Sequence, residues 1–222
     1  MAKRQKILLS WSGGKDSVVS LFELKSPDYK LLGLLTAVTA DNKIKTHQVP
    51  LELLEAQAES LELPLITVSL SNDSEYEAKM EAALKPMKNS KLEGVAFGDI
   101  NLEAVRNYRD QFFPKLKLGT HYPIWGWKPQ ALLKAFLGLG YKAIVVRVDT
   151  RKLPSTFVGR LFDWDFVEDL PQGVDPTGEN GEFHTFVYDG PFFQTAVPFE
   201  LGAKHQEGDF AFQELKLSKS SI

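Results

Sequence analysis

Apolar runs recur at regular intervals over the first half of the chain. Continuous apolar segments at residues 6–10, 31–37, 64–69 and 94–98 have the length of buried strands. The segments between them are amphipathic, with apolar residues at helical spacing. One opens at Pro50 and brings Leu51, Leu54, Ala58 and Leu61 to one face. Another follows the N-cap region Asn72-Asp73-Ser74 and carries Met80, Ala83, Leu84 and Met87. This alternation predicts an α/β fold with a Rossmann-like parallel sheet and helices on both faces.

The pattern changes after Gly119. An aromatic turn at residues 123–127 is followed by a predicted helix at 130–139 and a predicted buried strand at 143–148. Near the C-terminus, Phe210 and Phe212 alternate with polar or small residues, as in a half-buried strand. We therefore predict two domains, residues 1–119 and a smaller α/β domain at 120–222.

The composition narrows the class of protein. With 222 residues, 43% hydrophobic and 25% charged, the chain resembles an ordinary globular protein. It has no cysteine, which excludes disulfides, thiolate zinc sites, a cysteine nucleophile and a sulfur-relay thiol. No apolar stretch is long enough to span a membrane, and no apolar core of a leader follows the N-terminus, so we expect a cytoplasmic protein without a membrane partner. The net charge of −3 disfavours a long nucleic acid as partner.

Residues Ser12 to Ser17 read Ser-Gly-Gly-Lys-Asp-Ser and lie between the first strand and a helix. Gly13 and Gly14 allow the backbone N–H groups to approach an anion, and the helix adds free donors and the positive end of its dipole. Lys15 supplies a cation, and Ser12 and Ser17 supply hydroxyls. Asp16 would repel phosphate unless a divalent cation entered too. The motif predicts a site for a metal-bound nucleotide, with Asp16 as metal ligand.

This motif is neither a Walker A loop nor a dinucleotide-binding Gly-x-Gly-x-x-Gly. It resembles the pyrophosphate loop of the ATP pyrophosphatase group, the adenine nucleotide alpha hydrolase-like enzymes. The resemblance implies cleavage of ATP between its α and β phosphates and adenylation of a substrate oxygen.

Other candidates follow later strands. Asp99 comes directly after the fourth predicted strand, where polar groups often face a ligand, although it could also cap a helix. Arg106 and Arg109 could bind a phosphate or a carboxylate, but with Glu103 and Asp110 they equally fit a solvated helix face, which we favour slightly for Arg109. Aromatic packing is the favoured role of Trp125 and Trp127. The acidic stretch of Asp163, Asp165, Glu168 and Asp169 is interpreted as a solvated surface.

A second concentration of polar residues lies at positions 175–187. It places Glu179, Glu182 and His184 on or beside a glycine-rich turn. The period of two along a strand would put Glu182, His184 and Phe186 on one face and Phe183, Thr185 and Val187 on the other. Glu182 could then orient His184 or raise its pKa, which suits proton transfer from an incoming amine.

Several segments together resemble the diphthine–ammonia ligase family, in the same order and over nearly the whole chain. They are Ser12 to Ser17, Thr46-His47, Gly98-Asp99-Ile100, Pro123 to Gly126, Gly159-Arg160, Gly178 to Val187 and Asp189-Gly190-Pro191. The resemblance implies a HUP-type ATP-binding domain at residues 1–119 and a family-specific substrate domain at 120–222. It also implies amidation of the diphthine carboxylate on elongation factor 2 with ATP, Mg²⁺ and ammonium, giving AMP and pyrophosphate. A nucleotide- or substrate-binding role for His47 rests on the same resemblance.

Two positions depart from the family pattern. Archaeal and eukaryotic members usually have glycine where this chain has Asn180, and often glutamate where it has His184. The chain is more similar to the bacterial branch, whose hosts do not make diphthamide. Adenylation of a carboxylate is therefore expected to carry over better than diphthine as the substrate.

We interpret the chain as an ATP-dependent ligase. The loop at Ser12 to Ser17 would bind the β and γ phosphates with Mg²⁺, assisted by His47 and Asp99, and Glu179, Glu182 and His184 would form the reacting centre. Glu182 or His184 would accept the proton of ammonium. The alternatives are a non-catalytic adenine-nucleotide sensor and a tRNA-modifying enzyme, the latter disfavoured by the absence of cysteine and the acidic balance. The sequence leaves the oligomeric state open, with a homodimer as one option.

Overall fold

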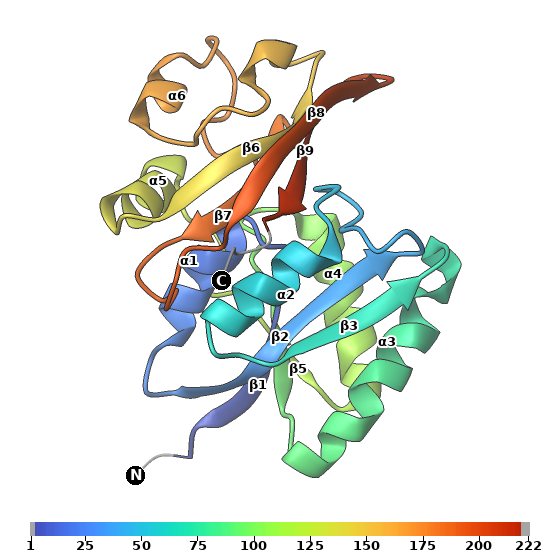
Figure 1. The fold of residues 1–222 in the computed structure, drawn as a ribbon. Coiled ribbons are helices and arrows are strands. Elements are labelled where there is room, and N and C mark those ends of the chain that lie inside the picture. The colour runs from blue at the N-terminus through green and yellow to red at the C-terminus, as the bar shows by residue number, and fades with distance from the viewer. Residues whose placement is uncertain (1–2, 219–222) are drawn as a thin grey trace.

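The computed structural model describes residues 3–218. Its first part is a five-stranded sheet of order β3-β2-β1-β4-β5, in which every paired strand is parallel (Figure 1). The strands are β1 (Gln5–Ser10), β2 (Tyr29–Thr39), β3 (Leu65–Leu70), β4 (Gly94–Ala96) and β5 (Gly119–His121). The helices between them are α1 (Lys15–Leu24), α2 (Leu51–Ser60), α3 (Tyr76–Leu84) and α4 (Glu103–Phe112).

Alternation along β1 explains why helices cover both faces of this sheet. Ile7 and Leu9 belong to one buried cluster with residues of α1 and α2, whereas Leu8 belongs to another with residues of α3 and α4. Successive side chains of a strand point to opposite faces, so a wholly apolar β1 requires cover on both sides. The predicted Rossmann-like α/β fold is confirmed.

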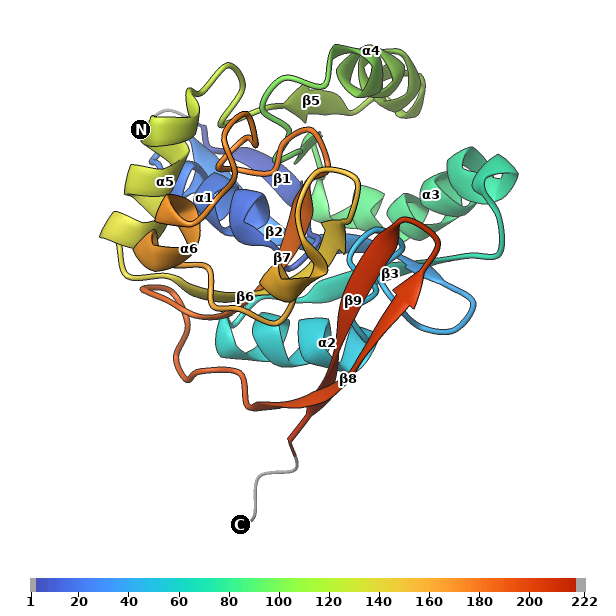
Figure 2. The same cartoon turned by 90° about the horizontal axis from the view of Figure 1, so that it is seen from above.

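The second part is a four-stranded antiparallel sheet of order β7-β6-β9-β8. Its strands are β6 (Lys142–Asp149), β7 (Phe183–Asp189), β8 (Phe199–Glu207) and β9 (Phe210–Leu217). Helix α5 (Pro129–Gly138) packs against α1 (Figure 2), and Phe162, directly before α6 (Trp164–Glu168), contacts the rings of Phe136 on α5 and Phe166 on α6. Short 3-10 helices occupy Asp73–Glu75, Lys85–Ser90, Phe113–Leu116 and Ser155–Phe157.

Several predicted elements differ in length from the observed ones; β2, at Tyr29–Thr39, is four residues longer than expected. The helix expected to continue through Met87 ends at Leu84 and passes into the 3-10 turn Lys85–Ser90, because Pro86 has no N–H to donate to the preceding turn. The fourth strand ends at Ala96, two residues earlier than expected. Strand β5 spans the predicted boundary between residues 119 and 120, and that boundary stays a prediction.

The strand order determines where a ligand can bind. The chain moves outward from β1 through β2 to β3 and then returns to the other side of β1 with β4, so β1 and β4 flank a switch point. Ligands of open α/β sheets bind at the carboxyl ends of the strands at this point. Strand β7 of the second sheet lies against the same place, since Val187 N–H donates to Gly13 O at 2.9 Å.

Candidate active site

The loop from Ser12 to Ser17 connects β1 to α1 at the switch point. Gly13 has φ 75°, and a Cβ added there would lie 2.7 Å from Oε1 of Gln57, so glycine is required. The two serine hydroxyls are 2.9 Å apart, and Ser12 N–H donates to Ser17 Oγ at 3.1 Å. These bonds draw the chain into a tight turn that ends at the first turn of α1.

Residues from α2 and β7 hold this loop from outside. The side chain of Gln57 is fully buried and donates to Gly13 O at 3.0 Å and to Val187 O at 2.5 Å. Its Oε1 accepts a hydrogen bond of 2.8 Å from Trp11 Nε1. Thr185 Oγ1 accepts from Lys15 N–H at 3.1 Å. The conformation of the loop therefore depends on two segments, α2 and β7, that are far from it in the sequence.

Gln57→Leu is expected to lower the free energy of unfolding by about 2 kcal/mol, because the buried groups of Trp11 and Gly13 lose a hydrogen-bond partner. We also expect pyrophosphate, as a probe of the loop, to bind about tenfold more weakly. Urea unfolding and calorimetric titration measure the two effects. Gln111→Leu, on the exposed side of α4, is the matched control. Unchanged pyrophosphate binding in Gln57→Leu would show that the loop keeps its shape without this residue.

Lys15 and Asp16 form a charge pair at the start of α1. Lys15 Nζ lies 2.8 Å from Asp16 Oδ2, and the Lys15 side chain is only 5% exposed. Asp16 Oδ1 is buried and has no hydrogen-bond partner in the protein. Burial raises the pKa of Asp16, opposed by Lys15 and reinforced by the nearby charge of Asp99. A buried carboxylate oxygen without a partner suits a cation, so Asp16 fits its predicted role toward Mg²⁺.

A cavity of about 600 Å³ opens above the loop. Its walls come from the carboxyl ends of β1, β2 and β4, the α4 residues Val105 and Arg109, and the turn before β7. The predicted site residues that line it are Ser12, Lys15, Asp16, Ser17, His47, Asp99, Glu179 and His184. Gly13 and Gly14 shape the loop from behind, and Glu182 is not part of the lining. The structure therefore gathers most of the predicted residues around one cavity.

Glu179 connects the second part of the chain to the loop after β4. Its Oε1 accepts hydrogen bonds from Ile100 N–H at 3.1 Å and Asn101 N–H at 3.3 Å. Burial raises the pKa of Glu179 to about 6, with a further contribution from the charge of Asp16, while these two hydrogen bonds and Lys15 oppose the shift. A carboxyl with a pKa close to neutrality can both accept and release a proton at physiological pH.

His47 and His184 meet at the other side of the loop. Their ring centroids are 4.6 Å apart, and Thr46 Oγ1 lies 2.9 Å from His47 Nδ1. Burial, together with the charges of Lys15 and Arg147, lowers the pKa of His47 to about 3. Burial and the same two cations also lower the pKa of His184, together with His47 itself. Both imidazoles are therefore neutral at pH 7.

This neutral pair makes stability depend on pH. An unfolded histidine gains a proton near pH 6.5, whereas folded His47 stays neutral down to about pH 3, so stability falls as the pH drops through 6.5. We expect His47→Gln to reduce the stability lost between pH 7 and pH 5 by about 2 kcal/mol. Urea unfolding at both pH values measures this difference. His205→Gln, on the edge strand β8, is the control. If stability falls with pH in His47→Gln as much as in wild type, the prediction is refuted.

Glu182 lies outside the lining of the cavity to which His184 belongs. It precedes β7, is 4% exposed, and its Oε2 has no hydrogen-bond partner. His184 contacts His47 instead, and its pKa is lowered where a carboxylate neighbour would have raised it. No hydrogen bond or ion pair joins Glu182 to His184, so the expected pairing is not formed.

Arg109 belongs to the cavity, contrary to the slight preference for a solvated helix face. Its guanidinium pairs with Asp99 and lies 4.2 Å from the centre of the Phe97 ring. Arg106, one turn away, instead stacks on Tyr122 and Trp125 outside this cavity. Sequence alone did not separate the two arginines, because their faces on α4 depend on how the helix is docked.

The acidic stretch lies mostly at the surface, as expected, with Asp165, Glu168 and Asp169 exposed. Asp163 caps α6 by accepting from Phe166 N–H at 2.8 Å, and Asp169 pairs with Arg160 at 2.7 Å. Within residues 3–218, no group of three His, Asp or Glu side chains is arranged to hold a metal ion.

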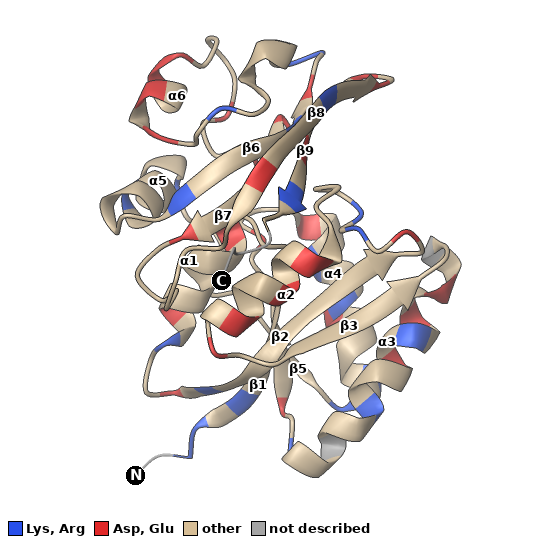
Figure 3. Cartoon of the chain, in the orientation of Figure 1, with Lys and Arg blue, Asp and Glu red and all other residues tan. Residues whose placement is uncertain are grey.

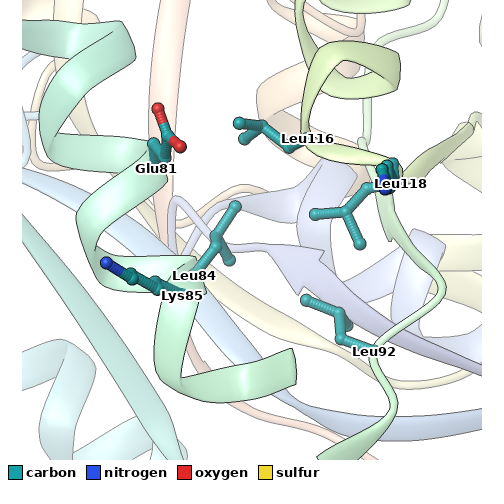
Figure 4. Close-up of a pocket in the computed structure, with 7 residues that line it drawn as sticks. Glu81, Leu84, Lys85, Leu92, Leu116 and Leu118 are labelled. Carbon is teal, nitrogen blue, oxygen red and sulfur yellow. The ribbon is translucent and has the colours of Figure 1, made fainter. Parts of the chain in front are cut away.

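A second cavity, of about 290 Å³, contains none of the predicted site residues (Figure 4). Leu84, Leu92, Leu116 and Leu118 line it with Glu81, Lys85 and Lys117. It lies at the amino ends of β4 and β5, opposite to the end of the sheet where ligands bind. We therefore take the cavity above the Ser12 to Ser17 loop as the candidate site.

The surface is of mixed charge. Figure 3 shows acidic and basic residues side by side on elements such as α3 and β8. Among the described helices, none combines the length and apolar character that a membrane span requires.

The fold and this site define a class: Rossmann-like α/β proteins with a glycine-rich loop at the switch point and a second, antiparallel sheet packed over it. Comparison with known proteins narrows the class. Residues 5–118 match the model of the diphthamide synthase N-terminal domain, and residues 128–220 match that of the diphthamide synthase C-terminal domain. The chain belongs to the diphthamide synthase family.

Curated relatives are similar at low identity. The diphthine–ammonia ligase of Danio rerio is 25% identical over 90% of this chain and 89% of its own length. That of Bos taurus is 22% identical over 84% of this chain and 79% of its own length. In Schizosaccharomyces pombe the match covers 95% of this chain but 39% of the relative, at 23% identity. These relatives support a ligase role for the chain.

Proposed function

We propose that the protein is an ATP-dependent ligase that adenylates a carboxylate and transfers the acyl group to ammonia, releasing AMP and pyrophosphate. The observation that carries the proposal is Asp16: a buried carboxylate oxygen without a protein partner, set beside Lys15 in a glycine-rich loop at the switch point. Such a group is unfavourable unless a cation accompanies the bound anion. Mg·ATP supplies both.

In this proposal the loop binds the β and γ phosphates. The N-terminal turn of α1 and the Lys15 ammonium offset their charge, and Asp16 holds Mg²⁺. When bound, Mg²⁺ stabilises the charge that develops on the pyrophosphate leaving group. His47 and His184 present uncharged imidazoles, which can hydrogen-bond to the nucleotide without a change in net charge.

Glu179 is the residue best suited to take the proton of ammonium. Its pKa of about 6 leaves it mostly ionised at pH 7, and its second oxygen is free of the bonds to Ile100 and Asn101. His184, with its lowered pKa, is a poorer proton acceptor than expected. The catalytic role of Glu182 stays a prediction, and its side chain does not line the cavity.

The acceptor named for the relatives is diphthine, which elongation factor 2 would carry if the host makes diphthamide. His184 and Asn180 both lie on the cavity, so the two departures from the family pattern fall within the site itself. We therefore propose the carboxylate–ammonia chemistry for this chain and leave diphthine as one candidate acceptor.

The test uses purified protein with Mg·ATP, ammonium and a panel of carboxylates that includes a diphthine-bearing protein. We expect AMP and pyrophosphate to appear in equal amounts, with acceptor-dependent amide formation. Tight ATP binding without turnover over the whole panel would favour a nucleotide sensor. Absence of ATP binding would end the nucleotide proposal altogether.

A further inference from the structure

The segment from Lys45 to His47, in the turn between β2 and α2, forms part of the cavity wall. His47 is its buried member, and Nε2 of its ring faces the Ser12 to Ser17 loop, since a Cβ added to Gly14 would lie 3.0 Å from that nitrogen. Gly14 is the N-cap of α1, where the helix stabilises an anion. His47 therefore presents Nε2 at the place where a phosphate oxygen would bind.

The other ring nitrogen of His47 already has a partner. Nδ1 lies 2.9 Å from Thr46 Oγ1. The pKa of His47, lowered to about 3 by burial, leaves the ring neutral at pH 7, and a neutral imidazole carries a single N–H. An ionised phosphate oxygen only accepts hydrogen bonds, so His47 can bind one only if that N–H is at Nε2. Nδ1 is then an acceptor, and the Thr46 hydroxyl must donate to it.

Thr46 is in turn held from the second sheet. Arg147, on β6, donates from Nη1 to Thr46 O at 2.8 Å. Its guanidinium lies 3.8 Å from the centre of the Phe210 ring on β9, and this stacking restricts its orientation. A continuous series of contacts thus runs from the second sheet through Thr46 to His47 and on to the Ser12 to Ser17 loop.

We propose that Thr46 and Arg147 are positioning residues of the nucleotide site: the Thr46 hydroxyl fixes His47 in the Nε2–H tautomer, and Arg147 holds Thr46 in place. His47 then donates from Nε2 to a phosphate oxygen bound at the Ser12 to Ser17 loop. The inference rests on the proposed function, because it takes the ligand of this loop to be a phosphate of the nucleotide. Both residues act through His47.

NMR on the ligand-free protein measures the tautomer. Proton–nitrogen correlation spectra of isotopically labelled protein distinguish a protonated ring nitrogen from an unprotonated one, and His47→Gln identifies the signals of His47 among those of the four histidines. We expect the Nε2–H tautomer in wild type. Thr46→Val should shift the Nδ1 resonance, because the accepted hydrogen bond is lost, whereas Thr46→Ser should keep the wild-type spectrum. A proton on Nδ1, or an unchanged Nδ1 resonance in Thr46→Val, would overturn the role of Thr46.

Calorimetric titration with pyrophosphate measures the effect on binding. Thr46→Val and Arg147→Met should each weaken binding about tenfold, and Thr46→Ser should stay within about twofold of wild type. Arg151→Met is the control for a lost charge, because Arg151 lies near the same Phe210 ring, at 5.6 Å, but pairs with Asp149. Arg147→Met should also shift the Nδ1 resonance of His47, which Arg151→Met should leave in place.

The possible results separate the two residues from the proposed function. Equal pyrophosphate binding in Arg147→Met and Arg151→Met would show that Arg147 acts only through its charge, and would overturn its positioning role. Unchanged pyrophosphate binding in Thr46→Val would overturn the inference as a whole. If wild type binds neither pyrophosphate nor ATP, the proposed function itself fails, and the positioning role fails with it.

Discussion

Asp16→Asn is expected to lower the Mg²⁺-dependent formation of AMP and pyrophosphate by about a thousandfold. The amide keeps the size of the side chain but removes the charge that attracts the metal ion. The variant should still fold, because burial already raises the pKa of Asp16 and disfavours its ionised form. We therefore expect Asp16→Asn to lower the rate of turnover and its dependence on Mg²⁺ while the protein stays folded.

The measurement is AMP release over a range of Mg²⁺ concentrations, together with ATP titration in the presence and absence of Mg²⁺. In wild type, Mg²⁺ should tighten ATP binding, and in Asp16→Asn it should have little effect. Asp41→Asn, in an exposed turn with a 63% exposed side chain, is the matched control. If Asp16→Asn keeps the Mg²⁺ response of wild type, Asp16 is not the metal ligand.

Glu179→Gln is expected to slow amide formation by about a hundredfold to ten-thousandfold while leaving the adenylation step largely intact. Glutamine can still accept the hydrogen bonds from Ile100 and Asn101, so the turn should stay docked. Only the ability to accept the proton of ammonium is lost. Exchange of pyrophosphate into ATP reports adenylation, and product amide reports transfer.

The pH profile provides a second measurement on this residue. Glu179 must be ionised to act as a base, so wild-type amidation should fall as the pH drops below about 6, and the variant should lack this limb. Hydroxylamine is uncharged at neutral pH and needs no prior deprotonation, so it should restore acyl transfer in the variant. An unchanged pH profile, or no recovery with hydroxylamine, would remove Glu179 from the proton-transfer step.

Part of the site could be predicted from the sequence because its residues are neighbours along the chain. The Ser12 to Ser17 loop follows an apolar strand and opens a helix, and Asp16 stands out there as a carboxylate in an anion site. The structural role of Gln57 could also have been predicted from the sequence. It lies three residues after Leu54 on the buried face of α2, where a polar side chain requires a hydrogen-bond partner.

The remainder depends on docking between segments that are distant in sequence. Periodicity tells which face of a helix is apolar, but not how far that helix is rotated or where its polar side chains end, so Arg109 and Arg106 could not be separated. The partners of His184 likewise depend on where β7 begins and on its approach to the loop that carries His47. Neither position follows from local spacing.

The sequence by itself determined the α/β class, the approximate positions of β1 to β4 and β6, and the phosphate-type loop, because these follow from local backbone preferences and from short-range apolar periodicity. Only the tertiary structure decided which groups share the cavity. Packing brings Glu179 onto the loop after β4, leaves one oxygen of Asp16 unpaired, and keeps two histidines neutral. Those properties arise from burial and from groups that are mostly distant in the chain, so no local pattern encodes them.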